Sequence, residues 1–249
     1  MAMNEIATRP NKAVYRDGKY CYKVFAVGYN KSDIFNEALN QARVEETGLF
    51  IPSIHEVKRL DDGRLAIVMD YVEGKSLAAL IEENPNKRTE YMERFIDIQL
   101  SMHKLTAPEL NKQRDKFSRK IDLSGLGEAS RYELHMRLDG MKKHNKLCHG
   151  DFNPSNVIIT NDDRACVIDW SHATIGNASA DTARTYLLFK LAGDDETAEN
   201  YMAMFCKKSG TDLRYVQNWL PIVAASQMVK GKPQEREMLT KWTDVCQYD

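Results

Sequence analysis

The sequence predicts an α+β fold in two lobes: a small antiparallel sheet with one helix, then a larger, mainly helical lobe that carries a β-hairpin. Before Gly74 the chain consists mostly of short strand-like runs separated by turns that contain Asp-Gly. Beyond Gly74 apolar residues recur at helical spacing. The exception is residues 147–170, where two short apolar runs flank a polar turn. We therefore expect an N-lobe over residues 1–73 and a C-lobe over residues 74–249.

The composition argues against several classes of protein. The 249 residues carry a net charge of −1, which gives no general attraction to nucleic acid or to an anionic membrane. No stretch approaches the length of a membrane span, and the first residues lack the apolar segment of a signal peptide. The cysteines are odd in number and never spaced as CxxC, which predicts free thiols in a cytoplasmic protein rather than disulfides or structural zinc. They are Cys21, Cys148, Cys166, Cys206 and Cys246.

The strands of the N-lobe are predicted as two hairpins. Residues 13–16 and 20–25 flank one Asp-Gly turn, and residues 54–60 and 64–69 flank another. Lys23 lies inside the second strand, between apolar neighbours. A lysine in that position is either an edge residue with its ammonium group in water or a ligand for an anion.

The helices are predicted from apolar spacing and end signals. Residues 32–47 form a helix capped by Ser32 or Asp33, with Glu37 close to its apolar stripe. In the C-lobe the basic run at 111–120 is expected to be a solvated face rather than a nucleic-acid patch. The remaining helical patterns cover residues 76–83, 89–105, 128–146, 178 onward, 197–207, 213–230 (interrupted by Pro221) and 233–247.

The hairpin at 147–170 carries oxygen side chains at its polar points. Asp151 and Asn156 precede the first strand, and Asp169 follows the second. A hairpin brings its two ends together, so these three side chains are expected to converge. Carboxylate and amide oxygens at one point suit a hard cation such as Mg²⁺.

The stretch His149-Gly150-Asp151-Phe152-Asn153-Pro154-Ser155-Asn156 resembles the catalytic loop of the protein-kinase-like superfamily, in its aminoglycoside phosphotransferase and choline kinase branch. The likeness continues through Val167-Ile168-Asp169-Trp170 and from Gly176 to Asp181-Thr182-Ala183-Arg184. The resemblance implies a bilobal protein-kinase-like fold and a small-molecule kinase.

The resemblance also implies roles for individual residues. Asp151 would be the catalytic residue that accepts the proton of, or orients, the attacking hydroxyl, and His149 would brace the loop. Asn156 and Asp169 would hold Mg²⁺ against the nucleotide phosphates. Lys23 would contact the α- and β-phosphates, held in place by Glu37.

The segment at 67–72 resembles the fifth strand of a kinase running into the hinge between the lobes. Met69 would be the gatekeeper, and the backbone of Asp70 and Val72 would contact the adenine edge. ATP is the expected cosubstrate, with GTP as the alternative.

The sequence departs from the family pattern at the phosphate loop, because residues 8–12 contain no glycine. Arg9 or Lys12 is a candidate to compensate. The residues after Asp169 also differ, being Trp170-Ser171 where kinases usually carry Phe-Gly.

The acceptor is expected to be a small molecule rather than a protein. Asn153 stands where Ser/Thr protein kinases usually carry lysine, and only eleven residues separate Asp169 from Asp181, the expected buried anchor of the next helix. An aminoglycoside, choline, another amino alcohol or a sugar all remain open, and the oligomeric state is not predicted. Candidate acceptor contacts, each also explicable as surface acid or core aromatic, are Asp194, Asp195, Glu196, Glu199, Trp170, Trp219 and Trp242.

Two alternatives compete with a kinase. A metal-dependent hydrolase could use His149, Asp151, Asp169 and His172 as ligands, but this leaves Lys23 and Asn156 unexplained. A catalytically impaired kinase fold could serve as a nucleotide-binding module, but such a chain would be expected to have lost some of the charged residues named above.

Overall fold

The computed structural model describes residues 4–244, and the chain forms two compact units. The sheet unit comprises Met1–Tyr91 and Pro154–Ala173, and the helical unit comprises Met92–Asn153 and Thr174–Asp249. An antiparallel sheet in one and helices in the other confirm the α+β fold class. The lobe boundary after residue 73 stays a prediction. Each unit is assembled from two separate stretches of the chain.

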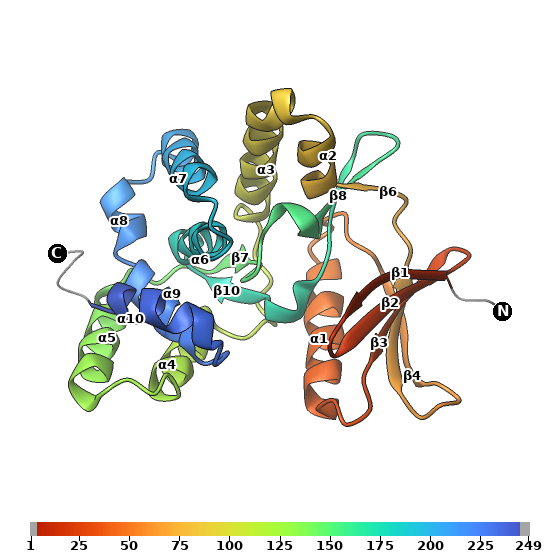
Figure 1. The fold of residues 1–249 in the computed structure, drawn as a ribbon, viewed down its shortest axis with the longest axis horizontal. Helices are drawn as coiled ribbons and strands as arrows, with labels where there is room; N and C mark the ends of the chain where they lie inside the picture. Colours follow the sequence, from red (N-terminus) through yellow and green to blue (C-terminus); the bar gives the residue numbers. More distant parts are fainter. Residues whose placement is uncertain (1–3, 245–249) are drawn as a thin grey trace. The chain divides into compact units, whose positions relative to one another are not determined.

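The sheet unit is built on a five-stranded antiparallel sheet with the order β1-β2-β3-β5-β4 (Figure 1). The turns at Gly18 and Gly63 both require a positive φ, which explains the Asp-Gly signal at each hairpin. The strands are β1 (Asn4–Arg9), β2 (Lys12–Asp17), β3 (Tyr20–Phe25), β4 (Ile54–Arg59) and β5 (Leu65–Asp70).

Strand alternation divides the buried side chains of this sheet between its two faces. Tyr22 and Val24 of β3 pack with their neighbours from β5 on one face. Phe25 packs on the other face against Ile34 and Ala38 of α1. Because Lys23 is two residues from Phe25, it shares the face that α1 covers.

Helix α1 (Lys31–Glu45) begins one residue earlier than its apolar pattern predicts. Its N-cap is Asn30, whose side chain accepts a hydrogen bond from the Ser32 amide at 2.9 Å. The prediction that Ser32 or Asp33 caps the helix is therefore wrong. All of these residue types are good caps, and sequence pattern alone does not choose among adjacent ones.

A second, three-stranded sheet in this unit contains the predicted hairpin: β6 (Gly74–Ser76), β8 (Val157–Thr160) and β9 (Ala165–Val167). Strand β6 pairs with β8 so closely that a Cβ at Gly74 would collide with the carbonyl oxygen of Ile159. Ser76 then caps α2 (Leu77–Glu83). The short 3-10 turns of the unit are η1 (Pro85–Lys87), η2 (Pro154–Asn156) and η3 (Trp170–His172).

The helical unit is centred on α6 (Ala178–Leu191), whose residues 179–187 are all buried. Helices α7, α8 and α9 pack against it, and β7 pairs with β10 beside it (Figure 1). Helix α3 begins in the sheet unit and continues here. The other elements are α3 (Arg88–Met102), α4 (Gln113–Asp122), α5 (Glu128–Gly140), β7 (Lys146–Cys148), β10 (Thr174–Gly176), α7 (Asp195–Ser209), α8 (Leu213–Gln217), α9 (Leu220–Met228), η4 (Pro233–Glu235) and α10 (Arg236–Trp242).

The predicted helix at 213–230 is in fact two helices, and the break comes before Pro221 rather than at it. Pro221 lies in the first turn of α9, where a proline lacks no helical hydrogen bond. The last residues of the predicted helix at 233–247, with Cys246, lie outside the described residues.

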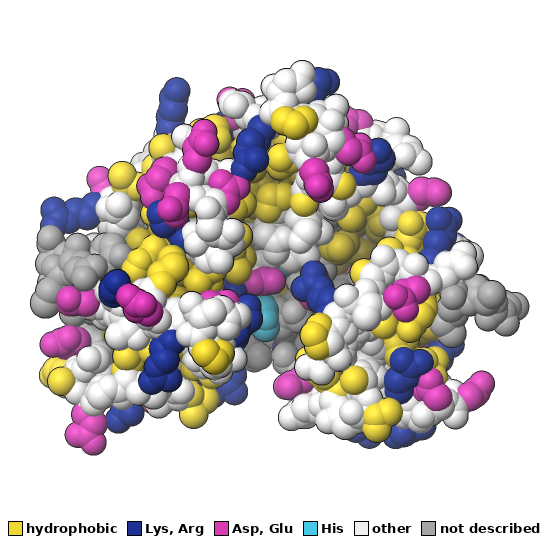
Figure 2. Space-filling view, in the orientation of Figure 1, with side chains coloured by type: hydrophobic (Ala, Val, Ile, Leu, Met, Phe, Trp, Pro, Cys, Tyr) yellow, Lys and Arg dark blue, Asp and Glu magenta, His cyan; other side chains and the backbone are white. Residues whose placement is uncertain are grey.

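Within residues 4–244, no helix is long and apolar enough to cross a membrane. The four described cysteines, Cys21, Cys148, Cys166 and Cys206, carry free thiols, as predicted. Figure 2 shows basic and acidic side chains interspersed over the visible face, in keeping with the net charge near zero.

Candidate active site

Lys23 is the centre of a charge network in the sheet unit. Its Nζ pairs with Glu37 Oε1 of α1 and lies 3.1 Å from Asp169 Oδ1. Lys12 Nζ lies 3.0 Å from the other carboxylate oxygen of Glu37. The network joins two lysines to two acids, so its charges balance. The structure thus brings together Lys23, Glu37 and Asp169, three of the residues singled out in the sequence.

The pKa directions show that Lys23 and Asp169 are both ionised at neutral pH. Burial alone would lower the pKa of Lys23, but the charges of Asp169 and Glu37 raise it above its ordinary value. Burial alone would raise the pKa of Asp169, but the charge and hydrogen bond of Lys23 hold it well below its usual range. Asp169 is therefore a carboxylate over the whole physiological pH range.

Asn156 and Asp169 lie at the two ends of the β8–β9 hairpin. The Ile168 amide donates a hydrogen bond of 2.9 Å to the carbonyl oxygen of Asn156, which ties the ends together. Asp169 has a left-handed backbone, with φ 63° and ψ 66°, an unusual conformation for aspartate that is common at functional sites. Asp151, the third residue expected to converge here, belongs to the helical unit, and its convergence with the other two stays a prediction.

The glycine-free phosphate loop is a tight turn of Pro10-Asn11 between β1 and β2. Lys12 follows it on the face that α1 covers, where it contacts Glu37 and lies 5.1 Å from the centre of the Phe25 ring. Of the two candidates to compensate for the missing glycines, Lys12 is therefore part of the charge network. Arg9 is exposed.

The hinge-like segment follows β5. Met69 pairs with Cys21 and Ile54 across the sheet, and its sulfur lies 3.7 Å from the Gln41 side-chain nitrogen. The Asp70 carboxylate accepts from the Ser53 amide, and the Tyr71 amide donates to the carbonyl oxygen of Lys19. Val72 lies in the irregular link before β6. The adenine-binding role of Asp70 and Val72 stays a prediction.

Asp151 lies in the helical unit and is held by Arg184 of α6. The Arg184 Nη2 atom lies 3.2 Å from Asp151 Oδ1. The Asp151 amide donates to His149 Nδ1 at 3.2 Å, and its carbonyl oxygen accepts from the Asn153 side chain at 2.9 Å. Arg184 appeared in the sequence only as the end of the family-like stretch, so its contact with Asp151 was missed. An arginine three residues after a helix-start aspartate gives no sign by itself of its distant partner.

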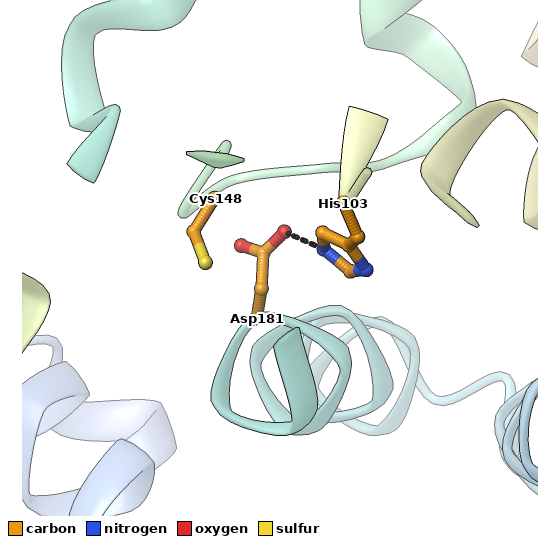
Figure 3. Close-up of side chains that lie close together, drawn as sticks. All are labelled: His103, Cys148 and Asp181. Carbon is orange, nitrogen blue, oxygen red and sulfur yellow. Dashed lines mark hydrogen bonds and ion pairs between the residues drawn. The ribbon is translucent and has the colours of Figure 1, made fainter. Parts of the chain in front are cut away.

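Asp181 of α6 braces the loop that carries Asp151. Its carboxylate accepts hydrogen bonds from the Gly150 amide at 2.7 Å and the His149 amide at 3.2 Å. It also accepts one from His103 Nε2 at 3.0 Å, which Figure 3 shows. Burial would raise the pKa of Asp181, but the hydrogen bond and charge of His103 and the Gly150 amide lower it below its ordinary value. The expected buried anchor is thus found, and it holds the loop directly.

Figure 3 also places Cys148 beside His103 and Asp181, a set of side chains that could in principle bind a metal. Burial raises the pKa of the Cys148 thiol well above its ordinary value, so it stays protonated. The Asp181 oxygens are already used by His103 and two backbone amides. We therefore interpret this cluster as the brace of the loop. The hydrolase alternative also weakens, since His149 Nδ1 accepts the Asp151 amide and is turned to its own loop.

The acids proposed to face a cationic acceptor are engaged locally in the structure. Asp194 caps α7 through the Thr197 amide, and Asp195 pairs with Lys190 at 2.6 Å. Glu199 accepts from the Tyr186 hydroxyl at 2.7 Å. Glu196 is exposed in the first turn of α7, where an acid favours the helix dipole. These positions give no evidence of a cation-binding site.

The tryptophans likewise belong mostly to the packing. Trp170 is fully buried and donates from Nε1 to the carbonyl oxygen of Val167. Trp219 is buried in the helical unit near Phe117. Trp242 is half-buried and stacks on Tyr186 with a centroid distance of 5.8 Å.

Comparison with known proteins gives one family and a group of solved structures. The sequence model of the family described as "Phosphotransferase enzyme family" matches residues 11–219. No curated protein sequence matches.

Three solved structures illustrate the likeness of fold. A thermostable mutant of aminoglycoside phosphotransferase APH(4)-Ia in its apo form is 14% identical, with 98% of this chain and 93% of that chain covered and a TM-score of 0.67. Aminoglycoside-3'-phosphotransferase of type VIII is 15% identical, with coverage of 92% and 93% and a TM-score of 0.66. A choline/ethanolamine kinase family protein from Mesorhizobium loti is 15% identical, with coverage of 100% and 84% and a TM-score of 0.59.

Proposed function

This chain belongs to the phosphotransferase enzyme family, and from that premise we propose that it transfers the γ-phosphoryl group of Mg-ATP to a hydroxyl of a small molecule. Membership makes it a small-molecule phosphotransferase with an alcohol group as acceptor. The nucleotide, the metal and the roles of individual residues are our proposal.

The observation that carries the proposal is the Lys23–Glu37–Asp169 network. A largely buried lysine held between two acids costs free energy, because its own charge and that of Glu37 are largely removed from water. It becomes useful where the lysine must stand ready for a phosphate. Lys23 is proposed to contact the α- and β-phosphates as a point charge, while Glu37 fixes its position.

The donor set of Asn156 and Asp169 fits a divalent cation. An amide oxygen and a carboxylate that stays ionised are the hard ligands that Mg²⁺ prefers, and they terminate the same hairpin. When bound, Mg²⁺ would neutralise phosphate charge during the transfer. This chain's own contribution is the ionised Asp169 beside Lys23.

Asp151 is proposed to orient the acceptor hydroxyl and accept its proton. Arg184 holds its Oδ1 atom, while His149 and Asp181 fix the backbone of the loop. Positioning of this kind supplies much of the rate enhancement in phosphoryl transfer, since the reaction needs little covalent help.

For the adenine ring of the nucleotide, we propose that the backbone of Asp70 and Val72 contacts its edge and that Met69 is the gatekeeper. Support comes from their place at the end of β5, where the chain leaves the sheet. ATP is the proposed cosubstrate and GTP the alternative. Free thiols agree with the cytoplasmic setting expected from the sequence.

The test is to measure nucleotide binding and turnover separately. Mg-ATP should raise the melting temperature of the wild-type protein, and slow hydrolysis of Mg-ATP should be detectable without an acceptor. Asp151→Asn should keep the thermal shift and lose the hydrolysis. Asp61→Asn, at an exposed turn of the sheet unit, is the matched control and should behave as wild type.

The alternative of a nucleotide-binding module has one observation in its favour, the glycine-free turn at Pro10-Asn11. It predicts a thermal shift with no hydrolysis in the wild type. Absence of any Mg-nucleotide binding would overturn the proposed function altogether.

A further inference from the structure

Cationic side chains gather around Asp151 in the helical unit. Lys116 and Lys120 are four residues apart and so share one face of α4, which packs on α9, as does α6. Arg184 comes from α6, and Lys230 follows α9. Lys116, Lys120 and Lys230 each interact electrostatically with both Arg184 and Asp151. Three separate elements therefore bring four basic side chains to one carboxylate.

Arg184 is fixed within this cluster by two partners. One end of its guanidinium group holds Asp151 Oδ1 at 3.2 Å, and the other donates to Gln227 Oε1 of α9 at 2.7 Å. Gln227 in turn donates to Glu235 at 2.6 Å. Arg184 is buried, so its charge and its direction are both set by the fold.

The nearby acids balance the cluster only in part. Asp181 keeps its charge and acts on Lys116, and Glu235 acts on Lys230. Arg119 and Lys232 add further positive charge beside Lys120 and Lys230, and Lys232 pairs with Glu235 at 2.8 Å. The carboxylate that all four cations share is Asp151. An excess of positive charge therefore surrounds the proposed catalytic residue.

Burial and repulsion between the cations both act on the two lysines of α4. Burial, with repulsion from Lys120 and Arg184, lowers the pKa of Lys116 to about 7, although Asp181 and Asp151 oppose it. Burial, with repulsion from Arg184, Lys230 and Arg119, lowers the pKa of Lys120 to about 8. A bound anion would relieve this repulsion and favour the charged form of both lysines.

We propose that the acceptor carries an anionic group, a phosphate, sulfate or carboxylate, beside the hydroxyl that is phosphorylated, and that Lys116, Lys120 and Lys230 bind that group while Arg184 positions Asp151. The proposal rests on the proposed function and deepens it. A polycationic acceptor such as an aminoglycoside would meet Arg184, Lys230 and the protonated fraction of Lys116 and Lys120 here, and like charges in close contact are strongly disfavoured. An anionic acceptor would instead be attracted by these cationic side chains.

The charge preference can be tested with hexose derivatives of different charge: glucosamine, glucose, gluconate and glucose 6-phosphate. We expect kcat/KM for the anionic pair to exceed that for glucosamine by about tenfold or more. Calorimetric binding of the same compounds, and of inorganic phosphate, reports the charge preference even where the hydroxyl is poorly placed for transfer. Equal or tighter binding of glucosamine overturns the proposal, as does failure of every anion, phosphate included, to bind.

Variants distinguish the acceptor from the nucleotide as the source of the bound anion. Lys120→Glu should raise KM, or the dissociation constant, for the anionic compounds about tenfold, with a smaller effect on KM for Mg-ATP. If the KM for Mg-ATP rises as much, the cluster serves the nucleotide and the proposal fails. The control is Lys207→Glu, which makes the same charge change at an exposed position of α7.

The proposed function and the anionic acceptor can be overturned separately. Mg-ATP binding and slow hydrolysis, combined with a preference for cationic or neutral acceptors, would leave the proposed function intact and overturn the anionic acceptor. Loss of Mg-ATP binding in the wild type would overturn the proposed function itself, whatever the anions do.

Discussion

The two charged clusters of this protein differ in their balance. In the sheet unit, Lys12 and Lys23 face Glu37 and Asp169, and each lysine has a partner within 3.1 Å. In the helical unit, four cations share Asp151. The first arrangement raises the pKa of its lysine, and the second lowers the pKa of both lysines on α4.

The difference indicates what each cluster lacks. In the balanced network the acids of the protein neutralise the lysines, so we expect the nucleotide to bind there together with a metal ion that offsets its charge. In the unbalanced cluster, we propose that a bound anion supplies the missing negative charge. Lysines in the two clusters therefore differ in whether they need an added anion, because they differ in the number of neighbouring acids.

Replacing Lys23 should have the largest effect. Lys23→Met would leave Glu37 and Asp169 without their shared cation, and turnover should fall about 10²–10³-fold. The free energy of unfolding should also fall by about 2–3 kcal/mol, less than for a fully buried pair because Asp169 is partly exposed. Urea denaturation and steady-state kinetics measure both quantities. The exposed Lys19→Met is the control, and wild-type activity in Lys23→Met would refute the role of the network.

Asp181→Asn tests the brace of the catalytic loop. The amide side chain cannot accept all the hydrogen bonds that the carboxylate accepts from His103, His149 and Gly150. We therefore expect the free energy of unfolding to fall by about 1.5–3 kcal/mol. Hydrogen exchange of the Gly150 amide should accelerate. Asp33→Asn controls for loss of an acid from a first helical turn, and unchanged exchange in Asp181→Asn would mean that the loop is held by other contacts.

The unbalanced cluster should make acceptor binding depend on pH. Lysine attracts an anion only when protonated, so kcat/KM for gluconate should fall as pH rises past about 7 and then 8, the pKa values of Lys116 and Lys120. The carboxylate of gluconate keeps its charge over this range. Binding near pH 7.5 should take up protons, which calorimetry in buffers of different ionisation enthalpy detects. A kcat/KM that rises with pH contradicts the prediction.

Lys12→Gln should have the smallest effect. The Lys12 side chain is partly exposed, and Glu37 keeps Lys23 as a partner. The free energy of unfolding should therefore fall by about 0.2–1 kcal/mol. The KM for Mg-ATP should rise only a few-fold. A far larger change would show that Lys12 replaces the missing glycine-rich loop.

Local signals accounted for much of the fold. The Asp-Gly turns, the helical spacing around Glu37 and the two short apolar runs at 157–167 all correspond to observed elements. Local pattern could not select the N-cap among similar adjacent residues, as at Asn30. It also could not decide whether a helix breaks before a proline or at it, as at Pro221.

Three members of the balanced network, Lys23, Glu37 and Asp169, were predictable because a family motif names them; Lys12 was only a candidate to compensate for the missing glycines. The basic run at 111–120 was expected to be solvated, yet Lys116 and Lys120 are half-buried and interact with Arg184 and Asp151. Their spacing of four residues puts them on one face, but which element that face meets depends on the packing of α4 on α9. Long-range packing, rather than composition, determines their role.

The ion pair between Lys23 and Asp169 joins two residues that the ribosome makes at different times. The two residues are 146 positions apart, so at typical elongation rates Asp169 is made roughly 7–30 s after Lys23. Glu37 and Lys12 are already present in that interval, so the network then has two lysines for one acid. The last strands of that unit, β8 and β9, likewise arrive late. Until this hairpin is made, Lys12 and Lys23 have only Glu37 as the acidic partner of their network.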